Sequence, residues 1–425
     1  MKIAVIGAGS TYTPELAEGL IRRAPSLPVT ELVLMDIDAR KLDIVGRLVQ
    51  RMAEHALAPF TVRRTMDLDD ALRGASFVMA QIRVGKLPAR LLDERIPLAH
   101  DLIGQETTGI GGMFNALRTI PVMTEIARRM EALCPDAWLI NFSNPSGMIA
   151  EALLRHTSVK MLGLCNIPVT MRAAIRKELN DPKAVVESVG LNHLSWITSV
   201  QSHGEERLQD LIDAGFSCER AANGASGFEA GCMRAAGGIP NSYLMYYYHH
   251  GDKLRALREQ PRTRAEICMG IEEELLKQYD DDSLYVKPAL LDQRGGHLYS
   301  EAAVALADSI WNDRGDIQVV NTKSLGALPC LQFDEVAELP CTIGKNGATP
   351  IQLRNSGTPH MHALIRSVKA FESMTVEAAY TGDRDLALAA LLTHPLIGDY
   401  SQAARCFDEM VCAHKGYLPQ FEVHA

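Results

Sequence analysis

Short apolar runs alternate with longer segments of helical periodicity over the first 165 residues. Such runs predict buried strands, and the segments between them predict the helices that connect parallel strands. We expect these strands to form one parallel sheet with helices on both of its faces. The predicted strands are Ile3–Ile6, Leu32–Met35, Phe77–Gln81, Trp138–Phe142 and Met161–Leu164.

The pattern changes after a further apolar run at Val185–Leu191. Long helical stretches then predominate, including Glu266–Lys277 and His360–Ala378, with Gly- and Pro-rich breaks at Gly237–Pro240 and Pro350. This half contains no repeat, and no low-complexity linker separates it from the first half. Tight packing between the two halves is therefore expected.

The first predicted strand runs directly into Gly7-Ala8-Gly9-Ser10-Thr11, which is typical of a strand that turns sharply into a helix. Gly7 permits the tight turn, and Gly9 lets the backbone approach a pyrophosphate at the positive end of that helix. We predict that a dinucleotide binds at Gly7, Gly9, Ser10 and Thr11. Tyr12 stands where the third glycine of a GxGxxG motif would be, and a glycine pair alone is a weak signal.

The second predicted strand ends in Asp36, 27 positions after Gly9. An acid there can accept hydrogen bonds from both ribose hydroxyls of adenosine and repels a 2′-phosphate, which favours NAD over NADP. The alternative is a flavodoxin-like strand-turn-helix without nucleotide, in which Asp36 is an ordinary helix-capping acid.

These patterns predict an α/β fold, a Rossmann-like doubly wound sheet with a C-terminal α+β substrate domain. We place an NAD-binding domain at residues 1–168, and a mixed domain for catalysis, substrate binding and oligomerisation at residues 169–425. A chain of 425 residues with 47% hydrophobic and 22% charged residues is long enough for two packed domains and is typical of a globular protein.

The net charge of −9 and the absence of a basic stripe argue against a nucleic-acid partner. No run of eighteen apolar residues is present, and the N-terminus begins a strand rather than a signal peptide, so we expect no membrane association and a cytoplasmic location. The nine cysteines, Cys218 among them, lack CxxC spacing, which predicts reduced thiols rather than a disulfide framework.

Cys165 and His193 each follow a predicted strand and lie 28 positions apart. A thiolate and an imidazole together can hold a divalent cation whose other ligands are substrate oxygens, as a weak and exchangeable site. A lone cysteine is more often a small buried hydrophobe, and a lone histidine is more often a satisfied core residue. The two residues alone leave both interpretations open.

Three further features suit chemistry at the carboxyl ends of the strands. Asn144 is placed to contact a substrate, although a residue before Pro145 also suits a plain turn. Tyr243 lies in a tyrosine-rich stretch, where a phenolate can act as a base if cations lower its pKa, and where the alternative is a packed helix face. The loops Gln81–Arg83 and Gly104–Gly109 carry arginine, acids and glycine suited to anionic oxygens.

Short motifs in a fixed order run almost from end to end of the chain. Together they resemble the NAD- and metal-dependent family 4 glycoside hydrolases, and within them the 6-phospho-β-glucosidase branch. The matching segments are GAGSTYTPEL (7–16), QIRVG (81–85), ARLLDERIPL (89–98), IGQETTGIGG (103–112), NALRTIPV (115–122), INFSNPSGM (140–148), GLCNIP (163–168), GLNHLSW (190–196), SYLMYYY (242–248) and QRGG (293–296).

The resemblance implies the lactate/malate dehydrogenase type of sheet and hydrolysis of 6-phospho-β-glucosides by transient redox chemistry. Bound NAD would oxidise the sugar at C3, the C2 proton would be removed, the aglycone would leave from C1, and water addition and re-reduction would follow. A divalent metal, with manganese expected, would be held by Cys165 and His193 and polarise the C2 and C3 oxygens. Tyr243 would be the base.

The same resemblance implies roles for further residues. Glu106 would raise the basicity of the tyrosine, and Asn166 is the residue that β-specific members show where α-specific members carry aspartate. The expected substrate contacts are Arg90, Asn144 and Arg264. The expected substrate is a phosphorylated disaccharide or aryl glucoside, and the expected assembly is a homodimer or homotetramer.

Lys86 departs from the branch, since many members have a second glycine there. This position leaves open a family 4 glycosidase acting on an unphosphorylated glycoside or a uronide. The alternative activity is an NAD-dependent 2-hydroxy-acid dehydrogenase, which shares the fold but has no use for the pair Cys165 and His193. A third alternative is a nucleotide-sensing or structural protein that keeps the fold without catalysis.

Overall fold

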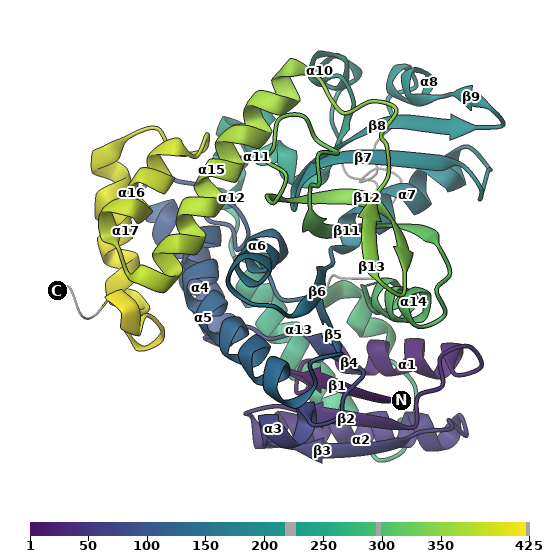
Figure 1. Cartoon of the computed structure of the whole chain (residues 1–425). Coiled ribbons are helices and arrows are strands. Elements are labelled where there is room, and N and C mark those ends of the chain that lie inside the picture. The colour runs from purple at the N-terminus through teal and green to yellow at the C-terminus, as the bar shows by residue number, and fades with distance from the viewer. Residues whose placement is uncertain (217–226, 295–298, 422–425) are drawn as a thin grey trace.

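The computed structural model describes residues 1–216, 227–294 and 299–421 (Figure 1). Its main sheet has nine strands in the order β13-β12-β11-β6-β5-β4-β1-β2-β3. The strands from β3 to β6 pair in parallel, and the sheet continues beyond β6 through antiparallel pairs. The strand bounds are β1 Lys2–Ile6, β2 Glu31–Met35, β3 Thr61–Thr65, β4 Phe77–Ala80, β5 Trp138–Asn141, β6 Lys160–Gly163, β11 Asp316–Lys323, β12 Val336–Gly344 and β13 Gly347–Pro350.

The five strands predicted in the first half are all present, each within one residue of its predicted limits. Their sequences are apolar throughout because helices cover both faces of a parallel sheet. Ile3, Ala4 and Val5 of β1 are fully buried, for example. The Rossmann-like prediction is confirmed for this half of the chain.

The strand order explains where a ligand can bind. The chain passes from β1 to β2 and β3 in one direction, then returns to place β4 on the other side of β1. Right-handed crossovers put the helices of these two directions on opposite faces, which opens a crevice at the carboxyl ends of β1 and β4. The helices of the first half are α1 Thr13–Arg23, α2 Ala39–His55, α3 Leu68–Leu72, α4 Lys86–Ala99, α5 Gly109–Leu133, α6 Ser146–His156 and α7 Asn166–Glu178.

The second half contributes more strand than its helical pattern predicted. Besides β11 to β13, it forms a small second sheet in the order β10-β8-β7, with β9 paired to β8. The hairpin between β7 and β8 turns at Asn192 and His193, and β12 packs against β7. The bounds in this sheet are β7 Val185–Leu191, β8 Leu194–Ser202, β9 Glu205–Glu206 and β10 Ile239–Pro240.

Two predicted breaks are wrong in part. Pro350 is the last residue of β13, and Pro240 belongs to β10. Both strands lie at the edge of a sheet, where a proline removes no hydrogen bond from an inner ladder. The break at Gly237 is correct, since this glycine has φ +85° and ends a helix.

Long helices surround these strands (Figure 1). The predicted helices Glu266–Lys277 and His360–Ala378 are confirmed inside α13 and α15. The helices of the second half are α8 Leu208–Asp213, α10 Ala230–Ala236, α11 Met245–Tyr248, α12 His250–Glu259, α13 Arg264–Tyr279, α14 Tyr299–Trp311, α15 Pro359–Thr381, α16 Arg384–Thr393 and α17 Tyr400–Ala413, with 3-10 turns at Ser242–Leu244, Ala289–Arg294, Lys415–Tyr417 and Pro419–Phe421.

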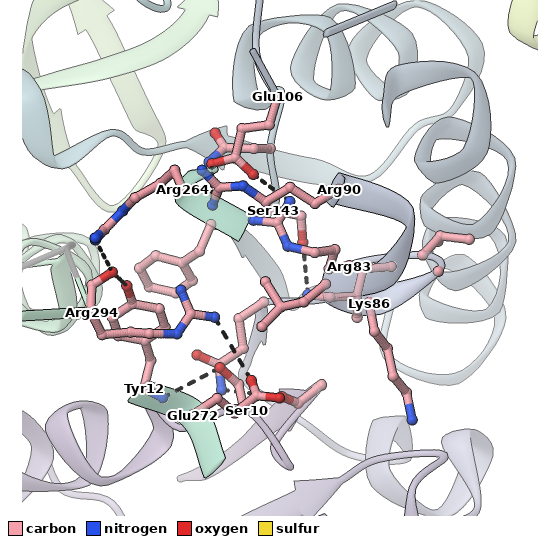
Figure 2. A pocket seen from close by; sticks show the side chains of 18 of the residues that line it. Ser10, Tyr12, Arg83, Lys86, Arg90, Glu106, Ser143, Arg264, Glu272 and Arg294 are labelled. Carbon is pink, nitrogen blue, oxygen red and sulfur yellow. Dashed lines mark hydrogen bonds and ion pairs between the residues drawn. The ribbon is translucent and has the colours of Figure 1, made fainter. Parts of the chain in front are cut away.

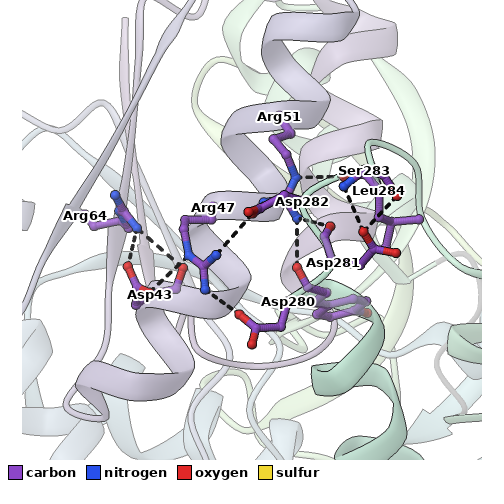
Figure 3. A network of polar contacts seen from close by, with 10 residues as sticks. Asp43, Arg47, Arg51, Arg64, Asp280, Asp281, Asp282, Ser283 and Leu284 are labelled. Carbon is purple, nitrogen blue, oxygen red and sulfur yellow. Dashed lines mark hydrogen bonds and ion pairs between the residues drawn. The ribbon is translucent and has the colours of Figure 1, made fainter.

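A polar network fastens α13 to α2, so that an element of the second half stays fixed beside the first half (Figure 3). Arg47 pairs with Asp43 on its own helix and with Asp280 at the end of α13. Arg51 donates to the carbonyl oxygens of Tyr279 at 2.8 Å and Leu284 at 2.8 Å. These contacts cap the carboxyl end of α13 with guanidinium groups, which its dipole favours.

A second charged group lies wholly inside the protein. Arg118 of α5 donates to both oxygens of Asp93 of α4, at 2.9 and 2.7 Å, and His414 stands 3.0 Å from the same carboxylate. All three side chains are 2% exposed or less. This buried triad joins α4, α5 and the segment after α17.

No helix within the three described ranges is long and apolar enough to cross a membrane. The cysteines of those ranges are free thiols. Cys218, and Gly295 and Gly296 of the QRGG segment, lie outside the described residues.

Candidate active site

One large cavity, of about 1040 Å³, opens at the carboxyl ends of the strands (Figure 2). Twelve of the thirteen site residues predicted from the sequence line it, so segments from both halves of the chain meet there. They are Gly7, Gly9, Ser10, Asp36, Arg90, Glu106, Asn144, Cys165, Asn166, His193, Tyr243 and Arg264. Thr11 does not line the cavity.

The glycine turn joins β1 to α1 as expected. Gly7 has φ +86°, and a Cβ atom on it would lie 2.8 Å from the carbonyl oxygen of Gln81. The amides of Gly7 and Ala8 both donate to the carbonyl oxygen of Met35 at 2.9 Å. The turn therefore needs glycine, and it delivers the N-terminus of α1 to the cavity.

Asp36 lies against this turn and not at a helix cap. Its Oδ2 accepts the Gly9 amide at 2.7 Å, and its Oδ1 accepts the Asp38 amide at 2.8 Å. A Cβ atom on Gly9 would lie 2.9 Å from the same Oδ2. The N-cap of α2 is Asp38, which accepts from Lys41, so the capping-acid alternative for Asp36 is wrong.

The residues after Gly9 separate into surface and interior. Ser10 lines the cavity, whereas Thr11 is 1% exposed and lies inside the protein. The backbone carbonyl oxygen of Thr11 accepts a hydrogen bond from the Tyr279 hydroxyl at 2.8 Å. Tyr12, in place of a third glycine, donates to the carbonyl oxygen of Arg294 at 3.1 Å, and the Arg294 guanidinium lies 5.3 Å from its ring centre. This tyrosine holds a segment of the second half over the turn.

Cys165 and His193 meet at the inner end of the cavity. Cys165 Sγ lies 3.4 Å from His193 Nε2, and both side chains are buried. Burial lowers the pKa of His193 to about 4 although Glu106 acts against it, so the imidazole is neutral at pH 7 and offers a lone pair. Neutral imidazole and a nearby sulfur are a donor set that fits a divalent transition metal.

Cys165 lies at the N-cap of α7. Burial and, next, the charge of Glu338 raise the pKa of its thiol well above the usual value, while the amides of Ile167 and Asn166 and the side chain of Asn192 act in the opposite direction. A bound cation would favour the thiolate. Within the described residues, no group of three or more His, Cys, Asp or Glu side chains is arranged to hold a metal. Cys165 and His193 together offer two donor atoms, one sulfur and one nitrogen.

Tyr243 stands beside this pair. Asn241 holds its backbone by accepting the Tyr243 amide at 2.9 Å, and the tyrosine ring stacks on His193 with centroids 4.0 Å apart. Burial raises the pKa of Tyr243, and the negative charge of Glu106 adds to the effect. The residue is a phenol in these surroundings, and a positive charge next to it would be needed to form phenolate.

Glu106 sits between two arginines (Figure 2). It pairs with Arg83 and, at 3.0 Å, with Arg90, which also donates to Glu94 at 2.7 Å. Burial would raise the pKa of Glu106, but the two guanidinium groups outweigh it and lower the pKa to about 2. Glu106 is therefore a fixed negative charge in the cavity wall.

The other predicted substrate contacts approach from separate elements. Arg264 begins α13 and donates to the carbonyl oxygens of Gln293 and Arg294 at 3.1 and 2.9 Å. Asn144 lies between β5 and α6, and Asn166 begins α7. Lys86 is half-exposed and pairs with Asp38 at 2.7 Å, so its ammonium group already has an anionic partner at the edge of the cavity.

Several lining residues were not singled out from the sequence. Arg83 follows β4, so the rule that ligands bind at the carboxyl ends of strands identifies it. Arg294 and Glu272 lie 3.8 Å apart, with Arg294 over the ring of Tyr12, and Tyr246 lies near Tyr243. Arg294 and Tyr246 lie in the segments QRGG and SYLMYYY, but nothing there distinguishes them from their neighbours, and Glu272 lies in no motif.

Family models match both halves of the chain. The model described as "Family 4 glycosyl hydrolase" matches residues 2–181, and that of the "Family 4 glycosyl hydrolase C-terminal domain" matches residues 188–397. The 6-phospho-beta-glucosidase of Escherichia coli (strain K12) is 40% identical over 99% of this chain and 97% of its own length.

Solved structures agree with this match. A 6-phospho-beta glucosidase from Thermotoga maritima, solved with manganese, NAD+ and glucose-6-phosphate, is 33% identical, covers 98% of this chain and 99% of its own, and superposes with a TM-score of 0.90. Malate dehydrogenase from Plasmodium falciparum, at 13% identity and a TM-score of 0.53 over 91% of this chain and 100% of its own, shares the fold alone.

Proposed function

Because this chain belongs to the family 4 glycosyl hydrolases, we propose that it hydrolyses 6-phospho-β-glucosides with NAD and a divalent metal, manganese first, as cofactors. Its similarity to 6-phospho-beta-glucosidases supports the substrate, and the manganese, NAD+ and glucose-6-phosphate in the T. maritima structure support the ligands. One observation supports the proposal most strongly. Cys165, His193 and Tyr243 lie next to one another in the same cavity as the glycine turn.

The residues present fit both cofactors. Gly7, Gly9 and Ser10 would hold the pyrophosphate and Asp36 the adenosine ribose, while Cys165 and His193 would hold the metal, with Thr11 supporting the turn from the interior. When bound, NAD supplies a hydride acceptor and donor for the sugar C3, and the metal supplies a Lewis acid for the C2 and C3 oxygens.

Tyr243 would accept the C2 proton at its phenolic oxygen. Its ring is held by stacking on His193, and Glu106 keeps a negative charge nearby that raises its affinity for a proton. Arg90 and Asn144 would orient the sugar, Arg264 would contact its anionic group, and Asn166 would face the β-linked side. Residues 1–168 would supply the cofactor site and residues 169–425 the base.

The substrates proposed are phosphorylated disaccharides and aryl glucosides. We propose a cytoplasmic location, supported by the buried free thiols of the described residues, which suit a reducing compartment. We also propose a homodimer or homotetramer. The exposed side chains of Leu325 and Phe333, which are neighbours after β11, support an interface, and light scattering of the purified protein measures the assembly.

Replacing Tyr243 by Phe tests the activity. With nitrophenyl β-glucoside 6-phosphate, NAD⁺ and Mn²⁺ under reducing conditions, we expect the wild type to release nitrophenol without stoichiometric NADH. Tyr243→Phe keeps the ring that stacks on His193 but removes the proton acceptor, so we expect kcat to fall about 10²- to 10⁴-fold.

Two further readouts decide the outcome. Product formed in D₂O should carry deuterium at C2, and the absence of this label would exclude Tyr243 as the C2 base. Steady NADH accumulation on a 2-hydroxy acid, without nitrophenol release from the glucoside, would contradict the proposed function in favour of a dehydrogenase.

A further inference from the structure

Glu338 lies behind the cavity, on β12, and is 1% exposed. Its Oε1 accepts a hydrogen bond from Asn192 Nδ2 at 3.0 Å, and its Oε2 accepts one from the Ser195 hydroxyl at 3.3 Å. These two residues flank His193 on either side. Glu338 therefore holds residues on both sides of the β7–β8 turn through hydrogen bonds.

The branch through Asn192 leads to the other predicted metal ligand. The Asn192 side chain lies close enough to Cys165 to lower the pKa of its thiol. Asn192 Oδ1 accepts the amide of Gly147 at 3.4 Å, at the start of α6. Asn192 thereby ties the β7–β8 turn to the helix that follows Asn144, next to Cys165.

The branch through Ser195 leads to Tyr243. The Ser195 hydroxyl accepts from Asn241 Nδ2 at 3.0 Å, and the Ser195 carbonyl oxygen accepts the Asn241 amide at 3.0 Å. Asn241 Oδ1 in turn accepts the Tyr243 amide at 2.9 Å. Three consecutive hydrogen bonds therefore run from Glu338 to the backbone of the proposed base.

A buried carboxyl group is costly for a fold when no cation pairs with it, and burial raises the pKa of Glu338 to about 7. Within the described ranges Glu338 forms no salt bridge, and its hydrogen bonds come from neutral amide and hydroxyl groups. An apolar residue would fill the same volume at less cost if packing were its only task. We propose that Glu338 is a positioning residue, which aligns Cys165 and His193 with each other and with Tyr243.

The inference rests on the proposed function for its catalytic part, and the two branches give it separate tests. Partners that orient metal ligands typically contribute 10- to 100-fold to metal affinity. Asn192→Ala should weaken Mn²⁺ binding to the full-length protein by about tenfold or more, measured by EPR of free Mn²⁺. Ser195→Ala should leave this affinity within about twofold, lower kcat, and raise the isotope effect of substrate deuterated at C2.

Substitutions at Glu338 itself should change both the Mn²⁺ affinity and kcat. Glu338→Ala should weaken Mn²⁺ binding about 10- to 100-fold and lower kcat. Glu338→Gln keeps one acceptor for Asn192 and should recover most of the Mn²⁺ affinity. The matched control is Glu187→Gln, which alters another buried glutamate, on β7, whose Oε2 accepts the Arg354 amide. It should leave both properties unchanged.

Three results separate the possibilities. Wild-type Mn²⁺ affinity and kcat in a folded Glu338→Ala variant, equal to those of Glu187→Gln, would overturn the positioning role. If Glu338→Ala does not fold by circular dichroism, the single-branch variants decide, and an unchanged Mn²⁺ affinity in Asn192→Ala overturns the role. If the wild type releases no nitrophenol, the proposed function fails, whereas the Mn²⁺ measurements still test the alignment of Cys165 and His193.

Discussion

Two adjacent acids on α4 face opposite ways and belong to different kinds of charged cluster. Asp93 points into the core, where Arg118 and His414 close around it. Glu94 points to the cavity and pairs with Arg90, which also pairs with Glu106. The two acids are 0% and 4% exposed, so burial alone does not distinguish them.

The difference lies in access to the cavity. The guanidinium of Arg118 is matched to a single carboxylate inside the protein, and nothing that binds in the cavity can reach it. Arg83, Arg90 and Glu106 are also paired, yet they line the cavity and can exchange part of their contacts for a ligand. The first cluster joins α4, α5 and the segment after α17, and the second fixes charge where chemistry is proposed.

Removing Arg118 should give the largest effect and should act on stability. Arg118→Ala leaves the Asp93 carboxylate buried without its main partner, and breaking such a pair costs about 3–5 kcal/mol. The free energy of unfolding in guanidinium chloride measures the loss. Arg128→Ala, on the exposed side of the same helix, is the control, and equal losses in the two variants would contradict a structural role for the triad.

Neutralising Glu106 should act on turnover first. Glu106→Gln removes the negative charge that raises the pKa of Tyr243, and we expect kcat to fall about 10²-fold. Its unfolding free energy should change less than that of Arg118→Ala because water in the cavity can solvate the released arginines. A folded variant with wild-type kcat would show that Glu106 belongs with the structural cluster.

The pH dependence of stability sharpens the same comparison. The pKa of Glu106 is lowered from 4.5 to about 2, so its carboxylate stabilises the fold fully above pH 4.5, and this contribution is lost as the pH falls through about 2. The difference in unfolding free energy between wild type and Glu106→Gln should therefore shrink between pH 4.5 and 2. A constant difference over this range would mean that the arginines do not hold the carboxylate ionised.

Lys86 should give the smallest effect, since its side chain is half-exposed where it pairs with Asp38 at the edge of the cavity. Lys86→Ala should change the unfolding free energy by less than about 1 kcal/mol. Lys86 has φ +55°, and alanine keeps the same backbone strain, so the substitution isolates the ion pair. A larger loss, or a clear rise in KM for the phosphorylated substrate, would indicate that Lys86 contributes to the cavity.

Local sequence was sufficient to predict the strands and the glycine turn of the first half. Gly7, Gly9 and Asp36 act through contacts within one strand-turn-helix unit and its neighbour, and apolar strands covered on both faces are easy to recognise. Thr11 was expected at the cavity but is buried. The side chains of adjacent turn residues point in different directions, and the sequence does not show which of them faces inward. Cys165 and His193 were each found at strand ends, but their 3.4 Å approach depends on the packing of two sheets.

The strands and site residues that were not predicted depend on contacts between segments that are distant in the sequence. Strand β3 contains two arginines, and β12 contains Pro340, so neither shows a clean apolar pattern. Arg294 lies in the QRGG segment and Glu338 in no motif, and the positions of these residues beside Tyr12 and Asn192 follow from the fold of more than 100 intervening residues. Such residues become visible only when hydrogen bonds are traced through the structure.

The pairing of β6 with β11 has a consequence for any attempt to separate the halves. Asn321 of β11 is paired with Gly163, two residues before Cys165, so the sheet crosses the proposed boundary at residue 168 without interruption. Cutting the chain there would leave on each fragment a strand edge with unpaired backbone N–H and C=O groups, and such edges promote aggregation. The first half therefore does not form a complete unit without β11, and the two halves have to be expressed and engineered as one chain.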